Sequence, residues 1–128
     1  MEKYVLLIDD DPVLNLISQR MIKNIDADIT VHTFLNGKDA LDYLTENFTP
    51  SRYYVILLDI NMPVLNGWQF LDAFKKIEPL QQHANFEIYM VSSSTDDNDF
   101  KKAKSYRIVT RFLVKPIALD AFKDLLLD

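Results

Sequence analysis

The 128-residue sequence contains no cysteine, only two histidines and only two glycines. The absence of cysteine excludes disulfide bonds, thiol catalysis and metal sites built from thiolates. His32 and His83 lie too far apart in the sequence to form a local pair of metal ligands. Any metal ion in this protein must therefore be held by oxygen atoms.

Positive charge and long apolar runs are also scarce. Lys and Arg total 14 against 19 Asp and Glu, which gives a net charge of −5 and opposes non-specific binding to nucleic acid or to an anionic membrane. The longest apolar run, Tyr53–Leu58, is far shorter than the roughly 20 residues of a membrane-spanning helix. We therefore expect a cytoplasmic protein with no nucleic-acid partner and no membrane partner. The length suits one domain, residues 1–128, with no effector domain.

Short apolar runs alternate with amphipathic stretches along the chain. The runs predict five strands, at Val5–Ile8, Ile29–Phe34, Tyr53–Leu58, Phe86–Val91 and Phe112–Val114. Five helices are expected after them, with apolar residues at helical spacing. Strands that alternate with helices favour right-handed crossovers and an α/β fold, in which helices cover both faces of a parallel sheet. Tyr53–Leu58 is the most apolar run and is expected to be central.

The helix starts and buried faces can also be predicted. Asp11 and Pro12 are typical of the N-cap and first residue of a helix. The segment Thr95–Asp97 likewise offers an N-cap residue and first-turn acidic residues to the fourth helix. The expected buried positions of the first, second, third and fifth helices are Leu14, Ile17 and Met21; Ala40, Leu41, Leu44 and Phe48; Trp68, Leu71, Phe74 and Ile77; and Leu119, Phe122 and Leu126.

Reactive side chains follow four of the predicted strands. They are Asp9–Asp11, Asp59, Ser92–Ser94 and Lys115–Pro116. Parallel sheets bind ligands beyond the carboxyl ends of their strands, so these groups are expected at one edge of the sheet. Each alone has an ordinary explanation, and we retain a capping role for Asp11. Their coincidence, in this order, is what indicates a functional site.

The charges of this group indicate its chemistry. Two carboxylates about 5 Å apart repel by roughly 3 kcal/mol at an effective dielectric constant of 20. Lys115 supplies one positive charge, and a hard divalent cation with oxygen ligands would supply two more. Mg²⁺ fits best, because it is typically held by a few carboxylates, water and phosphate oxygens. A carboxylate beside Mg²⁺, a lysine and a serine hydroxyl is suited to forming an aspartyl phosphate.

Four motifs in the chain resemble those of the receiver domains of two-component response regulators, and the resemblance covers essentially the whole sequence. The motifs are Leu6–Pro12, Asp59–Pro63 followed by Gly67, Met90–Ser93 and Phe112–Pro116. The resemblance implies a flavodoxin-like, doubly wound, five-stranded parallel sheet in the order 2-1-3-4-5, with five helices. It also implies a signalling protein rather than an enzyme, and the chain length, which leaves one helix after Pro116, predicts a stand-alone receiver.

The resemblance further implies a role for each matching residue. Asp59 would accept a phosphoryl group from the phosphohistidine of a histidine kinase or a histidine phosphotransfer protein. Asp9 and Asp10 would hold Mg²⁺ together with Asp59 and the backbone carbonyl of Asn61. The phosphoryl group would then switch a surface that binds a downstream protein partner, or pass onward in a phosphorelay.

The remaining matching residues would serve this reaction. Ser92 and Lys115 would bind the phosphoryl group, and Phe112 would turn as the switch residue. Asn61 and Ser94 would tune the lifetime of the phosphoryl group. The peptide bond before Pro116 would be cis. Outside these motifs, the polar segment Glu78–Asn85 predicts an extended connection to which we assign no function.

Two other function classes fit parts of the sequence. Asp9–Asp11 also resembles the Asp-x-Asp motif of haloacid-dehalogenase-type phosphohydrolases, but 128 residues leave no room for a cap domain and the Asp59–Pro63 motif would be unexplained. A flavodoxin-like redox carrier would need a phosphate-cradling loop rich in Ser, Thr or Gly after the first strand, which this sequence lacks.

Overall fold

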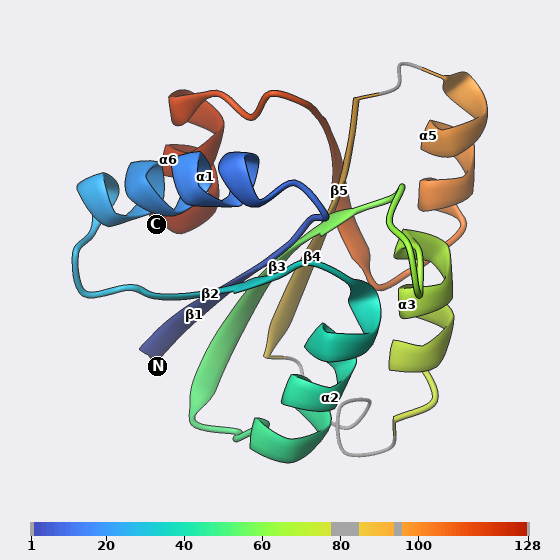
Figure 1. The fold of residues 1–128 in the computed structure, drawn as a ribbon, viewed down its shortest axis with the longest axis horizontal. Helices are drawn as coiled ribbons and strands as arrows, with labels where there is room; N and C mark the ends of the chain where they lie inside the picture. Colours follow the sequence, from blue (N-terminus) through green and yellow to red (C-terminus); the bar gives the residue numbers. More distant parts are fainter. Residues whose placement is uncertain (1, 78–84, 94–95, 128) are drawn as a thin grey trace.

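A computed structural model describes residues 2–77, 85–93 and 96–127 of the chain. Its five strands form one sheet in which every neighbouring pair is parallel (Figure 1). The order is β2-β1-β3-β4-β5, which confirms the predicted fold class and topology. The strands are β1 (Glu2–Ile8), β2 (Thr30–Phe34), β3 (Arg52–Asp59), β4 (Phe86–Ser92) and β5 (Val109–Val114).

Helices cover both faces of this sheet. Figure 1 shows α1 and α6 on one face and α2, α3 and α5 on the other. Each face has its own apolar core, one with Ile22 and Phe122 and the other with Leu44 and Phe70. The helices within the described residues are α1 (Pro12–Ile25), α2 (Gly37–Asn47), α3 (Gly67–Phe74), α5 (Asp97–Lys104) and α6 (Leu119–Leu126).

The predicted helix starts are confirmed where the structure describes them. The Asp11 side chain caps α1, with Oδ1 accepting hydrogen bonds from the backbone N–H groups of Val13 and Leu14 at 3.0 and 3.2 Å. Asp96 caps α5 through the N–H of Asn98 at 2.8 Å. Thr95 and most of the Glu78–Asn85 connection lie outside the described residues. Within the described part of the chain, no helix combines the length and apolarity needed to cross a membrane.

The buried face of α1 differs from the predicted one. Ile17 is 50% exposed, whereas Asn15 and Ile22 are the buried residues of this helix. Apolar residues occur almost all around α1, so helical spacing alone does not distinguish the face that meets the sheet. The prediction that Ile17 belongs to the core was wrong.

Two elements near the C-terminus also differ from the pattern in detail. β5 begins at Val109, three residues before the predicted start. The prediction began too late because Thr110 and Arg111, which are exposed on this edge strand, break the apolar run. In α6, Phe122 and Leu126 are buried as predicted, but Leu119 is exposed at the first turn.

The two glycines of the chain both accommodate the loop that follows β3. A Cβ atom at Gly67 would lie 2.7 Å from the carbonyl oxygen of Asp59, and one at Gly37 would lie 2.8 Å from that of Leu65. Both contacts are with backbone atoms, which cannot move away as a flexible side chain would. The close packing of α2 and α3 against this loop therefore requires glycine at both positions.

We predict that Gly67→Ala and Gly37→Ala each lower the free energy of unfolding by about 1–3 kcal/mol, because the added methyl group overpacks a rigid contact. Helix propensity alone would make alanine the more stable residue by up to about 1 kcal/mol. The sign of the change, measured by chemical denaturation, therefore distinguishes close approach from propensity. An unchanged or increased stability would show that the loop can move.

Candidate functional site

Three carboxylates converge at the carboxyl edge of the sheet. Asp9 and Asp10 follow the last residue of β1, and Asp59 is the last residue of β3. Because β1 and β3 are parallel neighbours, with Ile8 opposite Leu58, the residues that end them lie side by side. One carboxylate oxygen from each of the three residues lies within 4.8 Å of the others. The structure thus brings together the acidic residues that the sequence predicted to share a site.

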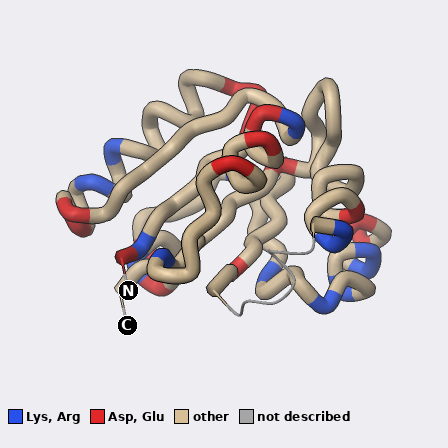
Figure 2. The backbone as a smooth tube through the Cα atoms, turned by 90° about the horizontal axis from the view of Figure 1, so that it is seen from below, with Lys and Arg blue, Asp and Glu red and all other residues tan. Residues whose placement is uncertain are grey.

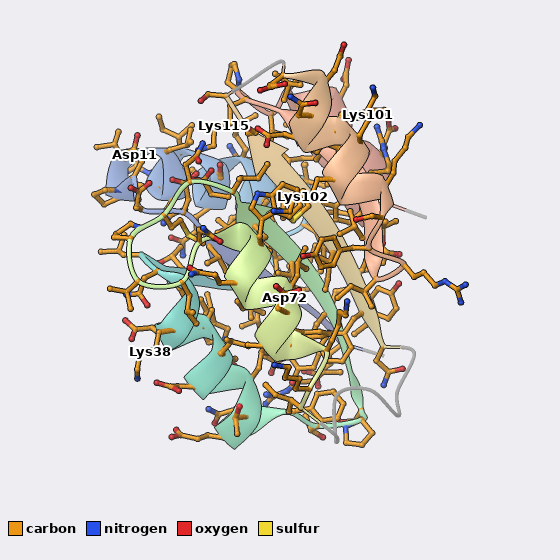
Figure 3. The ribbon with its side chains drawn as sticks, turned by 90° about the vertical axis from the view of Figure 1, so that its right-hand side faces the viewer. Asp11, Lys38, Asp72, Lys101, Lys102 and Lys115 are labelled. Atoms are coloured by element: carbon orange, nitrogen blue, oxygen red, sulfur yellow. The ribbon has the colours of Figure 1, made fainter. Side chains whose placement is uncertain are left out.

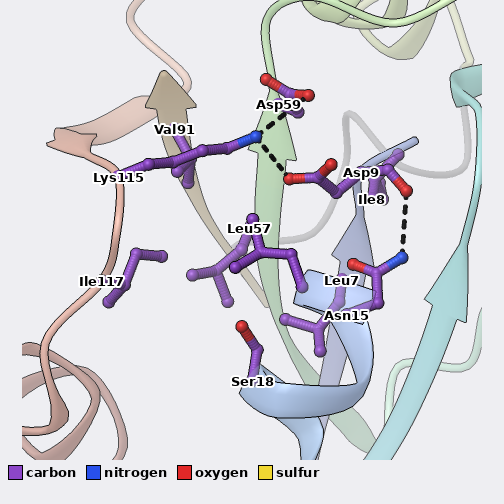
Figure 4. A pocket seen from close by; sticks show the side chains of 11 residues that line it. Leu7, Ile8, Asp9, Asn15, Ser18, Leu57, Asp59, Val91, Lys115 and Ile117 are labelled. Atoms are coloured by element: carbon purple, nitrogen blue, oxygen red, sulfur yellow. Dashed lines mark hydrogen bonds and ion pairs between the residues drawn. The ribbon is translucent and has the colours of Figure 1, made fainter. Parts of the chain in front are cut away.

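Lys115 brings a positive charge to this cluster from the turn after β5. Its backbone N–H donates to the carbonyl oxygen of Ser92 at 2.8 Å, which fixes the turn against the end of β4. Its ammonium Nζ lies 2.6 Å from Asp9 Oδ2 and 3.3 Å from Asp59 Oδ2 (Figure 4). The one ammonium is therefore shared by two carboxylates and is closer to Asp9.

Asp59 is buried and shares the Lys115 ammonium with a second carboxylate. Its exposed fraction is 4%. Burial raises the pKa of Asp59 first, and the nearby Asp9 carboxylate raises it further. Lys115 and the N–H of Asn61, 3.3 Å from Asp59 Oδ1, oppose the rise in pKa but do not cancel it. An ionised Asp59 therefore has a higher free energy here than in water.

The pKa of Lys115 moves upward for the complementary reason. Burial acts to lower it, but the contacts with Asp9 and Asp59 together outweigh this effect and raise the pKa. Lys115 is therefore a permanent cation at neutral pH, available to pair with any anionic group that reaches Asp59.

The donor set fits a hard divalent cation. The Lys115 ammonium pairs with Asp9 and Asp59, and Asp10 adds a third carboxylate, so the carboxylates of this cluster outnumber the ammonium that faces them. Asp10 is exposed, which leaves one side of the cluster open to water and to a further oxygen ligand. Mg²⁺ prefers such open sites, with a few carboxylates and several exchangeable oxygens. Asp9, Asp10 and Asp59 are thus the residues that would hold it.

The other predicted residues lie around this cluster or outside the described chain. Ser92, the last residue of β4, is fully buried, and Asn61, two residues after Asp59, is exposed. The Lys115–Pro116 peptide bond is cis. Ser94 lies outside the described residues, so its predicted part in tuning the phosphoryl lifetime stays a prediction.

Phe112 is placed away from the carboxylates, in a groove between α5 and β5. Its ring meets that of Phe100 edge to face, with 5.8 Å between the centroids. Lys104 and Arg111 also line the groove. Figure 2 shows Lys and Arg positions gathered on the side of the molecule that carries α5, although the net charge of the chain is negative. Residues 100–114 contain five of these cations and no Asp or Glu.

Asn15 is a site residue that the sequence analysis missed. It lies on the first turns of α1, is 4% exposed and donates a hydrogen bond from Nδ2 to the carbonyl oxygen of Asp9 at 3.0 Å. With Asp9, Asp59 and Lys115 it lines a narrow cavity beneath the carboxylates (Figure 4). Its position between apolar residues just after the acidic run was the available signal.

Comparison with known proteins gives a consistent result. Residues 5–127 match the family described as the response regulator receiver domain. The probable methanogenesis regulatory protein FilR2 of Methanothrix harundinacea is 27% identical over 121 residues, which cover 93% of this chain and 76% of that protein. The probable C4-dicarboxylate response regulator DctR of Halalkalibacterium halodurans is 27% identical over 93% of this chain. The chain spans only 47% of the length of DctR.

Solved structures agree with this match. A two-component response regulator from Cytophaga hutchinsonii superposes with a TM-score of 0.82 at 31% identity, covering 97% of this chain and 93% of that one. The chemotaxis protein CheY4 of Vibrio cholerae superposes with a TM-score of 0.79 at 25% identity, covering 98% and 97%.

We predict that Asp59→Asn raises the free energy of unfolding at neutral pH in the presence of a chelator. The folded-state pKa of Asp59 lies above its unfolded value, so the wild type loses stability as the pH rises through the folded pKa, and the neutral amide does not. The difference should shrink to nothing as the pH falls below the ordinary pKa of aspartic acid.

Denaturation curves across this pH range test the prediction. Asp28→Asn, which changes an exposed carboxylate outside the site, is the matched control and should show no comparable gain. A variant Asp59→Asn that is less stable than the wild type at neutral pH would show that Lys115 more than neutralises this carboxylate.

Proposed function

Since the chain belongs to the response regulator receiver domain family, a signalling domain of two-component systems and not a classical enzyme, we propose that it accepts a phosphoryl group on Asp59. The observation that carries this proposal is the buried Asp59 carboxylate beside the Lys115 ammonium, which it shares with Asp9. The donor we propose is the phosphohistidine of a histidine kinase or of a histidine phosphotransfer protein.

The chemical step is a displacement at phosphorus. A carboxylate oxygen of Asp59 forms a bond to phosphorus as the bond from phosphorus to the histidine nitrogen breaks, and the imidazole leaves with that electron pair and takes a proton. Lys115 favours the ionised form of Asp59 before the step and then pairs with a phosphoryl oxygen. Burial of Asp59 favours the step, because it leaves the attacking oxygen weakly solvated.

Mg²⁺ is the proposed cofactor, and when bound it would offset the negative charge of the phosphoryl group. Asp9 and Asp10 would hold it with Asp59 and the backbone carbonyl of Asn61. Asn61 lies two residues after Asp59 and donates its backbone N–H to Asp59 Oδ1, which supports this ligand set.

The exposed surface beside the site supports a protein donor. Val13, Leu16 and Ile17 of α1 are all about half exposed or more, although they are apolar. They follow the acidic turn directly, so a donor that covers them would reach Asp59. An apolar patch at this position is typical of a protein interaction site.

The output we propose is a contact with a downstream protein or onward phosphotransfer. The Ser92 hydroxyl would bond the phosphoryl group, and Phe112 would then turn and change the groove between α5 and β5. This is a bistable element biased by a local charge. That the protein acts as a stand-alone receiver in the cytoplasm, without nucleic acid or membrane, stays a prediction.

The direct test is phosphoryl uptake from acetyl phosphate, followed by intact mass. We expect the wild type to gain one phosphoryl group in the presence of Mg²⁺ and none in its absence, and Asp59→Asn to gain none under either condition. Asp11→Asn is the matched control, because Asp11 caps α1 instead of facing Asp59, and it should take up the group as the wild type does.

Other outcomes would overturn the proposal. Uptake that survives Asp59→Asn would place the acceptor elsewhere. Steady turnover of an aryl phosphate that depends on Asp9 but not on Asp59 would favour the phosphohydrolase alternative.

Movement of α5 should be visible through the single tryptophan. Trp68 of α3 lies under the ammonium of Lys102 of α5, 4.7 Å from the ring centroid, and stacks on Tyr106 at 5.8 Å (Figure 3 shows Lys102 between the two helices). We predict that phosphorylation changes Trp68 emission, because a shift of α5 moves this cation relative to the ring.

Three variants make this fluorescence test specific. The change should be absent in Asp59→Asn, and Lys102→Met should reduce it while uptake continues. Phe112→Ala should also reduce it if Phe112 transmits the switch. An unchanged response in Phe112→Ala would remove the switch role from that residue.

A further inference from the structure

Asn15 stands out because the first turns of α1 bury this polar side chain and expose apolar ones. Asn15 is 4% exposed, while its apolar neighbours Val13, Leu16 and Ile17 face outward. A buried amide without a specific partner would be unfavourable compared with an apolar side chain. The hydrogen bond from Asn15 Nδ2 to the Asp9 carbonyl oxygen provides that partner.

Asn15 contacts both ends of the acidic turn. Its side chain binds the carbonyl oxygen of Asp9, and its backbone N–H donates to the carbonyl oxygen of Asp11 at 3.1 Å. Within the turn, the N–H of Asp11 donates to Asp9 Oδ1 at 2.9 Å. Hydrogen bonds therefore hold the residues on either side of Asp10, namely Asp9 and Asp11.

The orientation of the amide is determined by chemistry. A carbonyl oxygen can only accept, so the NH₂ group of Asn15 must face Asp9 and the amide oxygen must face the cavity, as Figure 4 shows. Aspartate at this position would present an acceptor to an acceptor, and leucine would present nothing. Among residues of this size, asparagine supplies a donor without adding a charge next to the carboxylates.

We infer that Asn15 is a positioning residue for the cation ligands, an inference that rests on the proposed function. The three carboxylates repel one another, and the turn that carries Asp9 and Asp10 would relax away from Asp59 unless it were held. Through the hydrogen bond to the Asp9 carbonyl oxygen, Asn15 holds this turn against α1. It thereby keeps the oxygens in the arrangement that a divalent cation requires before the cation arrives.

The test is Mg²⁺ affinity, measured by calorimetric titration of the folded protein at a temperature well below unfolding. Asn15→Leu keeps the branched shape of the side chain, although leucine is larger, and removes the donor. We expect its dissociation constant for Mg²⁺ to rise about threefold to tenfold, the range that loss of one ordinary hydrogen bond produces. A purely structural role would lower the unfolding temperature without changing the affinity of the protein that remains folded.

Ser18→Ala is the matched control. Ser18 lies one turn further along α1 and lines the same cavity, but within the described residues it makes no hydrogen bond to the acidic turn. Its variant should bind Mg²⁺ as the wild type does. Phosphoryl uptake gives a second readout, because the defect of Asn15→Leu should disappear at saturating Mg²⁺.

The outcomes separate this inference from the proposed function. A wild type that binds no Mg²⁺ and takes up no phosphoryl group would contradict the proposed function itself. If the wild type does both, an unchanged Mg²⁺ affinity in Asn15→Leu would overturn the positioning role. So would an uptake defect that persists when Mg²⁺ is saturating.

Discussion

The structure depends on holding like charges together at one edge of a parallel sheet. Parallel pairing of β1 and β3 places Asp9, Asp10 and Asp59 within a few ångströms, and the single ammonium of Lys115 does not neutralise them. Burial first, and the Asp9 carboxylate second, raise the pKa of Asp59. This unfavourable charge suits the site to the cation and the electrophile that we propose for it, and stability and reactivity would then be opposed at the same residue.

The rest of the fold resists this repulsion. Both glycines allow backbone to approach the loop after Asp59 more closely than any Cβ would permit, and the backbone N–H of Lys115 is tied to the end of β4. Two apolar cores, one on each face of the sheet, bury the strands that end at the site. The carboxylates lie at the ends of strands and beside the capped start of α1, where the backbone has little freedom to move the charges apart.

Much of this was predictable from the sequence, and the limits have physical causes. The alternation of strands and helices was enough for a parallel α/β sheet, and the reactive residues after its strands were enough for the convergence of the carboxylates. The strand order followed only from the resemblance to receiver domains. The inward face of α1 was not predictable, because apolar residues surround that helix and only packing against the sheet selects Ile22 over Ile17. Asn15 was missed for the same reason, since its meaning depends on which way the helix is turned.

The unequal sharing of Lys115 explains why Asp59, and not Asp9, suits the role of acceptor. The ammonium is 2.6 Å from Asp9 and 3.3 Å from Asp59, and Asp9 also accepts the N–H of Asp11 at 2.9 Å. Asp9 is thus engaged by its neighbours, whereas both contacts of Asp59, with Lys115 and with the N–H of Asn61, are long. A buried carboxylate with long, weak hydrogen bonds keeps its electron density available to attack phosphorus. Asp9 and Asp59 have the same side chain, and they differ in these contacts because the backbone places them differently relative to Lys115 and to the neighbouring N–H groups.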